Sequence, residues 1–304
     1  MIFELPQPLQ TIELTMADGA IIRVRRHGNP DGPRLALSHG NGLAINGYAP
    51  FWRLFCDRYD VIVFDQRNHG ANPYHGEAGH QWATLVSDAQ AIWRGIRASW
   101  GEKPAAGVFH SLSGVVAIGQ ALEFGQAWDL LILFDPPLTP PAGHALHDLF
   151  VERQRELARR TLRRIERFSD PSALAQRWAQ NPIFRRWLPE ARAAMAQATL
   201  RRDPAGADYV LSCPRELEAR IFASSESVPF WTRMDRLRGP VKLVCGDLSD
   251  ADQNVVSLVG HALAQEYGFA FEAIPHTSHF LQLEQPERCV RAVEEFLRRN
   301  ALVK

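Results

Sequence analysis

The feature that most constrains this chain is a series of short apolar runs, each ending in a polar or glycine-rich turn. These runs are Arg34–Ser38, Val61–Phe64, Ala105–Phe109, Leu130–Phe134 and, much later, Val241–Cys245. They are typical of parallel strands that are buried on both faces of a sheet. Segments with apolar positions at helical spacing, such as Tyr48–Phe55 and Thr84–Trp100, lie between them. This alternation predicts an α/β fold with a doubly wound, mostly parallel sheet.

The two ends of the chain fit the same plan. Gln10–Leu14 and Ala20–Arg26 flank the turn dipeptide Asp18-Gly19, which predicts an opening hairpin. Strand character returns for the last time at Ala270–Ile274, and Glu287–Asn300 has the pattern of a closing amphipathic helix.

The middle of the chain has a different texture. Four prolines follow Asp135 closely, and His144–Arg220 is rich in Ala, Leu and Arg. We therefore expect a helical cap inserted at residues 136–231, with the core formed by residues 1–135 and 232–304. The many arginines between Arg153 and Arg202 are interpreted as a solvated helix face.

Composition narrows the possible partners. Lys plus Arg and Asp plus Glu both count 34, so the formal net charge is zero, which argues against a nucleic-acid binder. The sequence has no secretory leader pattern and no apolar stretch of about 18 residues, so we expect a cytoplasmic protein that acts on a small molecule without a membrane. Its four cysteines lie far apart and show no metal-binding spacing, so no metal site is expected.

Ser111 is the candidate nucleophile. It directly follows the predicted strand Ala105–Phe109 and precedes the helix-like Gly114–Phe124, so it stands at the tip of a strand-to-helix turn. Such a turn exposes the hydroxyl and offers the unpaired N–H groups of a helix start to a developing negative charge. The same position would also suit a plain helix N-cap.

Two histidines compete for the role of general base. His276 and His279 both lie between the last predicted strand and the closing helix. A neutral imidazole has the pKa needed to accept the serine proton near neutral pH. We favour His279, because the residues that follow it lead directly into the last helix.

A glycine-flanked loop, His39-Gly40-Asn41-Gly42, ends the strand Arg34–Ser38. Backbone N–H groups in such a loop can approach a substrate oxygen closely. We interpret Asn41 as an oxyanion-hole donor, paired with the amide of Leu112, although a plain glycine turn would have the same sequence.

The carboxylate that orients the histidine has several candidates. Asp247, Asp250 and Asp252 follow the strand Val241–Cys245, and Asp135 follows the preceding strand. Chain order and loop position favour Asp250, with Asp135 as the alternative.

A further polar loop, Asp65–Gly70, follows Val61–Phe64. We expect Asp65 and Arg67 to form an ion pair that braces the loops beside the oxyanion turn.

Together these motifs resemble the α/β-hydrolase superfamily in order and spacing, namely His39-Gly40-Asn41-Gly42, Asp65-x-Arg67-x-His69-Gly70, His110-Ser111-Leu112-Ser113-Gly114 and Ser278-His279-Phe280. The resemblance implies a serine hydrolase with Ser111 as nucleophile, His279 as base, a carboxylate orienter and the Asn41 and Leu112 amides as oxyanion hole. It implies no metal and no organic cofactor.

The sequence departs from that family at two places. Phe109 and Ser113 stand where the family's G-x-S-x-G turn has glycines, and Ser249 stands where its acid usually lies. The bulk of Phe109 predicts either a rearranged turn or a side chain directed toward the pocket. Asp250 is expected to compensate for Ser249 through a longer turn.

The resulting functional prediction is a carboxylesterase-like hydrolase of an ester or lactone. The same triad could instead serve carbon–carbon bond hydrolysis or perhydrolysis, and a non-catalytic ligand-binding protein is the alternative outside enzymes. Aromatic residues of the insertion are expected either to line an apolar pocket or to pack it on the core, namely Phe150, Trp178, Phe184, Trp187, Phe222, Phe230 and Trp231.

Overall fold

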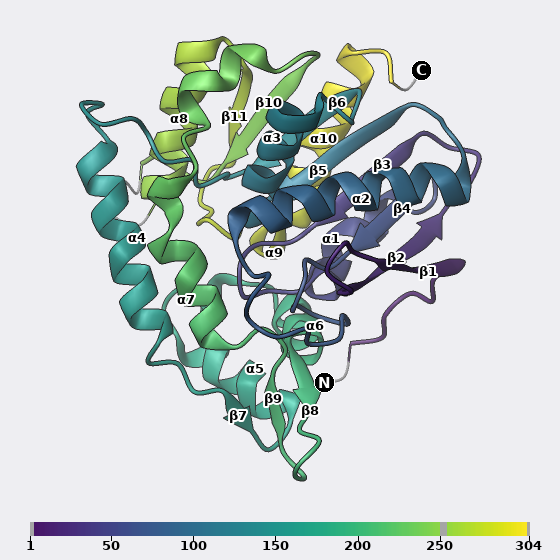
Figure 1. Cartoon of the computed structure of the whole chain (residues 1–304), viewed down its shortest axis with the longest axis vertical. Coiled ribbons are helices and arrows are strands. Elements are labelled where there is room, and N and C mark those ends of the chain that lie inside the picture. The colour runs from purple at the N-terminus through teal and green to yellow at the C-terminus, as the bar shows by residue number, and fades with distance from the viewer. Residues whose placement is uncertain (1–2, 250–253, 303–304) are drawn as a thin grey trace.

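The computed structural model describes residues 3–249 and 254–302, and its centre is an eight-stranded sheet (Figure 1). In spatial order the strands are β1 (Gln10–Thr15), β2 (Ile21–Gly28), β4 (Asp60–Phe64), β3 (Arg34–Ser38), β5 (Ala105–His110), β6 (Leu130–Phe134), β10 (Val241–Cys245) and β11 (Ala270–Ala273). The pairs β1–β2 and β2–β4 are antiparallel, and all the others are parallel. The predicted doubly wound, mostly parallel sheet is confirmed.

The predicted opening hairpin is also present. Leu14 pairs with Ile22 across it, and the Met16 N–H donates to the Ala20 carbonyl at 2.8 Å. Gly19 closes the turn with a φ of 88°, a left-handed conformation that glycine adopts without steric cost.

Side chains of each central strand alternate between two apolar layers. Leu131 and Leu133 of β6 face the layer that contains α2 (Trp82–Trp100), α3 (Leu112–Phe124) and α8 (Val255–Tyr267). Ile132 and Phe134 face the opposite layer, where α1 (Ala49–Trp52), α9 (Leu281–Glu284) and α10 (Pro286–Arg299) lie. Both faces of the sheet are thereby buried, as its continuous apolar runs require. Helix α8 was not predicted from the sequence.

The segment between β6 and β10 contains both helices and strands. Its helices are α4 (His147–Thr161), α5 (Pro171–Gln180), α6 (Pro189–Thr199) and α7 (Arg215–Ala223), and α4 and α7 run side by side at the left of Figure 1. The prediction of helices alone was incomplete, since β7 (Arg167–Phe168), β9 (Tyr209–Leu211) and β8 (Leu200–Arg202) pair antiparallel in that order. Strands of two or three residues are too short for a period of two to be visible in the sequence.

Short 3₁₀ turns complete the described structure, at Ile45–Tyr48, Arg53–Phe55, Phe184–Arg186, Ser225–Ser227 and Trp231–Arg236. Within residues 3–249 and 254–302, no helix has both the length and the apolarity needed to cross a membrane.

Candidate active site

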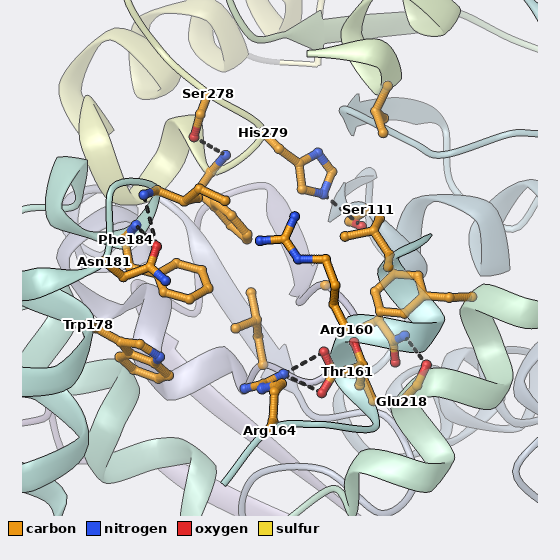
Figure 2. Close-up of a pocket in the computed structure, with 18 of the residues that line it drawn as sticks. Ser111, Arg160, Thr161, Arg164, Trp178, Asn181, Phe184, Glu218, Ser278 and His279 are labelled. Atoms are coloured by element: carbon orange, nitrogen blue, oxygen red, sulfur yellow. Dashed lines mark hydrogen bonds and ion pairs between the residues drawn. The ribbon is translucent and has the colours of Figure 1, made fainter. Parts of the chain in front are cut away.

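The candidate catalytic residues meet where the direction of the strand order reverses. The chain moves from β3 to β4 on one side of β3, whereas β5 lies on its other side, so β3 and β5 form a topological switch point. Crevices at such points are the usual ligand sites of open α/β sheets. The loop after β3 carries Gly40, the turn after β5 carries Ser111, and His279 arrives from the loop after β11. The Nε2 atom of His279 lies 3.0 Å from the Ser111 Oγ (Figure 2).

Ser111 has the strained backbone of a tight strand-to-helix turn. Its φ of 52° and ψ of −117° lie in a region that residues with a side chain rarely adopt. Hydrogen bonds hold it there, because its N–H donates to the Phe134 carbonyl at 2.9 Å and its own carbonyl accepts from the Gly114 N–H at 2.9 Å. The turn leaves the Oγ facing the cavity at the head of α3.

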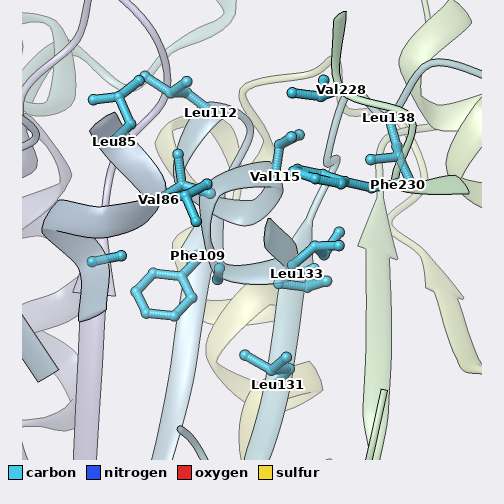
Figure 3. Packing of buried hydrophobic residues seen from close by; sticks show 14 of the residues in the cluster. Leu85, Val86, Phe109, Leu112, Val115, Leu131, Leu133, Leu138, Val228 and Phe230 are labelled. Carbon is cyan, nitrogen blue, oxygen red and sulfur yellow. The ribbon is translucent and has the colours of Figure 1, made fainter. Parts of the chain in front are cut away.

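Phe109 does not disturb this turn. Its ring is buried in the layer beneath α3 (Figure 3) and packs edge-on against Trp128 with ring centroids 5.5 Å apart. Gly107 makes the room, because a Cβ atom there would lie only 2.4 Å from the Phe109 Cε2. Both expectations for Phe109, a rearranged turn and a side chain directed toward the pocket, are therefore wrong. Residues two apart lie on the same face of a strand, so the residue that must be small to accommodate the Phe109 ring is Gly107 of β5.

Ser113 braces the same turn. Its hydroxyl donates to the His110 carbonyl at 2.9 Å and lies 3.1 Å from the His110 N–H, which donates to it. A glycine at this position would lack both hydrogen bonds, so the serine ties the first turn of α3 to the end of β5.

Among the residues that the structure describes, Asp135 provides the carboxylate that contacts His279. Its Oδ2 lies 3.3 Å from the His279 Nδ1, and the side chain is fully buried. The Ser257 hydroxyl donates to it at 3.0 Å, and the Gly246 N–H approaches its Oδ1 at 3.4 Å. Asp250, which the sequence favoured, lies outside the described residues.

The other polar residues of this region have different surroundings. Asp247 accepts hydrogen bonds from the Ser249 hydroxyl at 2.7 Å and the His276 N–H at 2.6 Å. These two donors lower the pKa of Asp247 to about 2. The His276 side chain is 88% exposed, whereas His279 lines the cavity together with Ser111.

The predicted oxyanion loop is hydrogen-bonded to α7. The Asn41 Nδ2 donates to the Glu218 carbonyl of α7 at 2.8 Å, so this side chain is directed toward α7. Asn41 and Ser111 line the same cavity. Leu112 is the first residue of α3, and the N–H groups of a first helical turn have no acceptor within the helix.

The family follows from the sequence match over this whole region. Residues 35–292 match the model of the alpha/beta hydrolase family. The chain belongs to this family.

Solved structures share the fold at low sequence identity. E-2-(acetamidomethylene)succinate hydrolase aligns with a TM-score of 0.73 and 19% identity, covering 95% of this chain and 100% of that chain. An esterase from Thermogutta terrifontis gives 0.67 and 23% over 95% and 98% of the two chains. A bromoperoxidase from Bacillus anthracis gives 0.69 and 16% over 95% and 100%. At these identities the likeness shows the fold.

In this alpha/beta hydrolase, His110 links the two loops that flank Ser111. Its Nε2 lies 2.9 Å from the His279 carbonyl oxygen, which can only accept, so Nε2 carries the proton. Its Nδ1 then accepts from the Tyr48 hydroxyl at 2.6 Å, and that hydroxyl lies 3.4 Å from the Gly40 N–H. Burial lowers the pKa of His110 well below its usual range and keeps the ring neutral, as this pattern requires. Sequence reasoning missed this role, because Tyr48 lies far from His110 in the chain.

The predicted Asp65–Arg67 ion pair is wrong. Asp65 pairs with Arg25 at 2.9 Å, whereas Arg67 contacts Asp88 of α2 at 2.6 Å and Asp18 of the hairpin turn at 2.7 Å. The two side chains leave the loop in different directions, so each contacts an element distant in sequence.

Two neutral histidines hold the loops together. The His69 Nε2 accepts from the Gly42 N–H at 3.1 Å, and the His39 Nε2 accepts from the Gln66 N–H at 3.0 Å. Both rings are buried, and burial lowers the pKa of each. A protonated ring would lose these acceptors.

A cavity of about 440 Å³ opens in front of Ser111 and His279. Of the aromatic residues expected in the insertion, Trp178, Phe184 and Phe222 line it. The others are buried in the two apolar layers instead, namely Phe150, Trp187, Phe230 and Trp231. Both predicted roles of these side chains therefore occur.

Proposed function

We propose that this alpha/beta hydrolase is a carboxylesterase-like serine hydrolase that cleaves an ester or lactone of a small, partly apolar substrate through an acyl-enzyme. The observation that supports it best is the contact between Ser111, in its strained turn, and His279, whose Nε2 lies 3.0 Å from the serine Oγ. Nucleophile and base within hydrogen-bond distance are the signature of covalent catalysis by serine.

The proposed reaction has two halves. The Ser111 Oγ attacks the substrate carbonyl carbon while the His279 Nε2 takes its proton, and the tetrahedral intermediate then expels the alcohol, which receives that proton. Water next attacks the acyl-enzyme with His279 again as base, and the acid leaves as Ser111 is restored. In both halves the backbone amides of Asn41 and Leu112 are proposed to hold the oxyanion.

Asp135 is proposed as the orienting acid, in place of Asp250. Its carboxylate faces the His279 Nδ1 at 3.3 Å and is fully buried. A buried negative charge at that position fixes the tautomer with a free Nε2 and stabilises the imidazolium formed when the serine proton is taken.

The segment 136–231 is proposed as the lid of this site. Residues of α4, α5 and α7 form cavity walls opposite Ser111 and His279. The hydrogen bond from Asn41 to the Glu218 carbonyl connects this lid to the oxyanion loop. The proposed steps use only side chains and backbone amides of this chain and no cofactor. The reactants are a small-molecule substrate and water.

The test is labelling by a fluorophosphonate, which reacts with activated serines. We expect mass spectrometry to place the label on Ser111, and Ser111→Ala and His279→Ala to abolish it. His276→Ala is the matched control, because this neighbouring histidine is 88% exposed, and it should label at the wild-type rate.

Failure of the label to reach Ser111, or labelling that persists in His279→Ala, would refute the proposal. Ligand binding without turnover would then favour a non-catalytic receptor. If Ser111 is labelled but esters and lactones are inert, product analysis with carbon–carbon substrates or with peroxide would test the alternative uses of the same triad.

A further inference from the structure

The cavity in front of Ser111 is lined by an unusual number of cations. Its described lining residues include five arginines and one acidic residue, Glu218; the arginines are Arg153, Arg160, Arg163, Arg164 and Arg177. The whole chain has a formal net charge of zero, so this excess is local. The interpretation of these arginines as a solvated helix face was incomplete, because the fold directs part of that face into the cavity.

The spacing on α4 explains the convergence. Gln154, Leu157, Arg160, Thr161 and Arg164 recur at intervals of three and four, which places them on one side of the helix and its C-terminal turn. All five line the cavity. Figure 2 shows Arg160 extending from α4 into the cavity that also contains Ser111 and His279. Arg159, on another side of α4, is not among the lining residues.

Only part of this positive charge is balanced by the described residues. Arg164 pairs with Glu218, which is buried and whose pKa burial raises. Arg153 and Arg160 share one partly exposed carboxylate, that of Glu156, at 3.0 and 3.5 Å. One carboxylate cannot neutralise two guanidinium groups, and exposed ion pairs of this kind contribute little to stability.

Within residues 3–249 and 254–302, Arg163 and Arg177 have no carboxylate partner among the ion pairs. The wall opposite Ser111 therefore carries a net positive charge.

Arg160 and Arg177 lie in the last turns of α4 and α5, where a positive charge also favours the helix dipole. That effect acts within each helix and does not explain why both side chains line one cavity. Clustered guanidinium groups repel one another, and the apolar walls of a cavity strengthen their field. Guanidinium groups bind carboxylate and phosphate oxygens bidentately. An anion in the cavity would relieve the repulsion.

We propose that the substrate carries an anionic group, a carboxylate or a phosphate, which the arginines of α4 and α5 bind while its ester carbonyl meets Ser111. This inference rests on the proposed hydrolase function and names its substrate class. The apolar side chains of the same cavity, such as Leu157, Trp178 and Phe184, would contact the carbon chain between the two groups.

The test compares matched esters. The para-nitrophenyl valerate and the para-nitrophenyl monoester of glutarate have acyl chains of equal length and differ only in a terminal methyl or carboxylate. The ester of phosphonobutyrate is the phosphate-like arm. We expect kcat/KM to be at least about tenfold higher for one of the anionic esters than for the valerate, and this ratio to fall as salt is raised.

Arg160→Gln and Arg177→Gln should each lower kcat/KM for the preferred anionic ester about tenfold and change that for the valerate less than about twofold. Arg160→Lys should recover part of the loss. Arg159→Gln is the matched control on the same helix and should change neither value. Arg164 is left intact, because its loss would strand the buried Glu218.

A second readout separates this inference from the proposed function. Binding of the same three esters to Ser111→Ala, measured by calorimetry, should show the same preference and the same dependence on Arg160 and Arg177. Equal or better turnover and binding of the valerate would overturn the inference and leave the hydrolase proposal intact. Arginine-dependent binding of the anionic esters with no turnover by the wild type would uphold the anion-binding role of Arg160 and Arg177 and contradict the hydrolase proposal.

Discussion

The substitution Asp135→Asn tests the proposed catalytic geometry most directly. The Asp135 Oδ2 lies 3.3 Å from the His279 Nδ1. An imidazolium and a carboxylate at that separation attract by about 5 kcal/mol at an effective dielectric constant of about 20. Asparagine removes the charge and can turn an amide N–H toward Nδ1, which favours the tautomer whose Nε2 cannot accept the serine proton. We therefore expect kcat to fall between about 10³- and 10⁴-fold.

The assay is single-turnover and steady-state hydrolysis of an activated ester, together with the rate of fluorophosphonate labelling. Asp250→Asn is the discriminating comparison, since Asp250 is the acid that sequence order favours. Asp247→Asn is a matched control, because Asp247 contacts the turn around His276 and Ser249 instead of His279. Both should retain activity within about tenfold.

Stability must be measured in the same variants. Asparagine keeps one oxygen to accept from the Ser257 hydroxyl, so Asp135→Asn should lower the free energy of unfolding by no more than about 3 kcal/mol. Two results would refute the assignment of Asp135. One is a folded Asp135→Asn variant with near wild-type kcat, and the other is a fall in kcat of about 10³-fold or more in Asp250→Asn but not in Asp135→Asn.

Three further predictions follow from the surroundings of the site. Tyr48→Phe removes the donor to the His110 Nδ1, so kcat/KM should fall about tenfold and the free energy of unfolding by about 1–3 kcal/mol in urea titrations; an unchanged kcat/KM would contradict the role of His110. Gly107→Ala places a Cβ 2.4 Å from the Phe109 ring, so it should cost about 1–3 kcal/mol by the same method, and adding Phe109→Leu should recover part of that loss. The buried ring of His80 lies 5.6 Å from that of His69, centroid to centroid, and burial lowers the pKa of His80 to about 4, below its unfolded value of 6.5. The unfolded state therefore binds more protons in this interval, and stability should fall as pH drops from 6.5 toward 4. Thermal scans should show a smaller decline in His80→Gln, and an identical decline would exclude His80 as a contributor.

Most of the fold could be predicted from local sequence patterns. The sheet strands were visible because each is an apolar run closed by a turn, and the hairpin because Asp18-Gly19 separates two strand-like runs. Ser111 could be named because it stands between a predicted strand and a predicted helix, and His279 because the residues after it lead into the last helix. These inferences depend only on a few neighbouring residues and on the chain order of the elements.

The role of Phe109 could not be predicted correctly from residue identities alone. Its bulk predicted a disturbed turn, yet the ring lies over Gly107, two residues earlier on the same face of β5. The signal was present in the sequence as a glycine inside an apolar strand, a pattern that marks close approach of a neighbouring group. Linking it to Phe109 required the packing beneath α3.

By itself, the sequence determined the alternation of buried strands and helices and the positions of Ser111 and His279, because chain connectivity and side-chain periodicity act over short distances. Only the tertiary structure decided which groups meet across the fold. Asp135 contacts His279, which lies 144 residues away in the sequence. Arg67 pairs with Asp88 instead of Asp65, and arginines of α4 line the cavity. Such contacts depend on strand order and on the orientation of the helices between β6 and β10, which arise when many weak packing interactions are satisfied together.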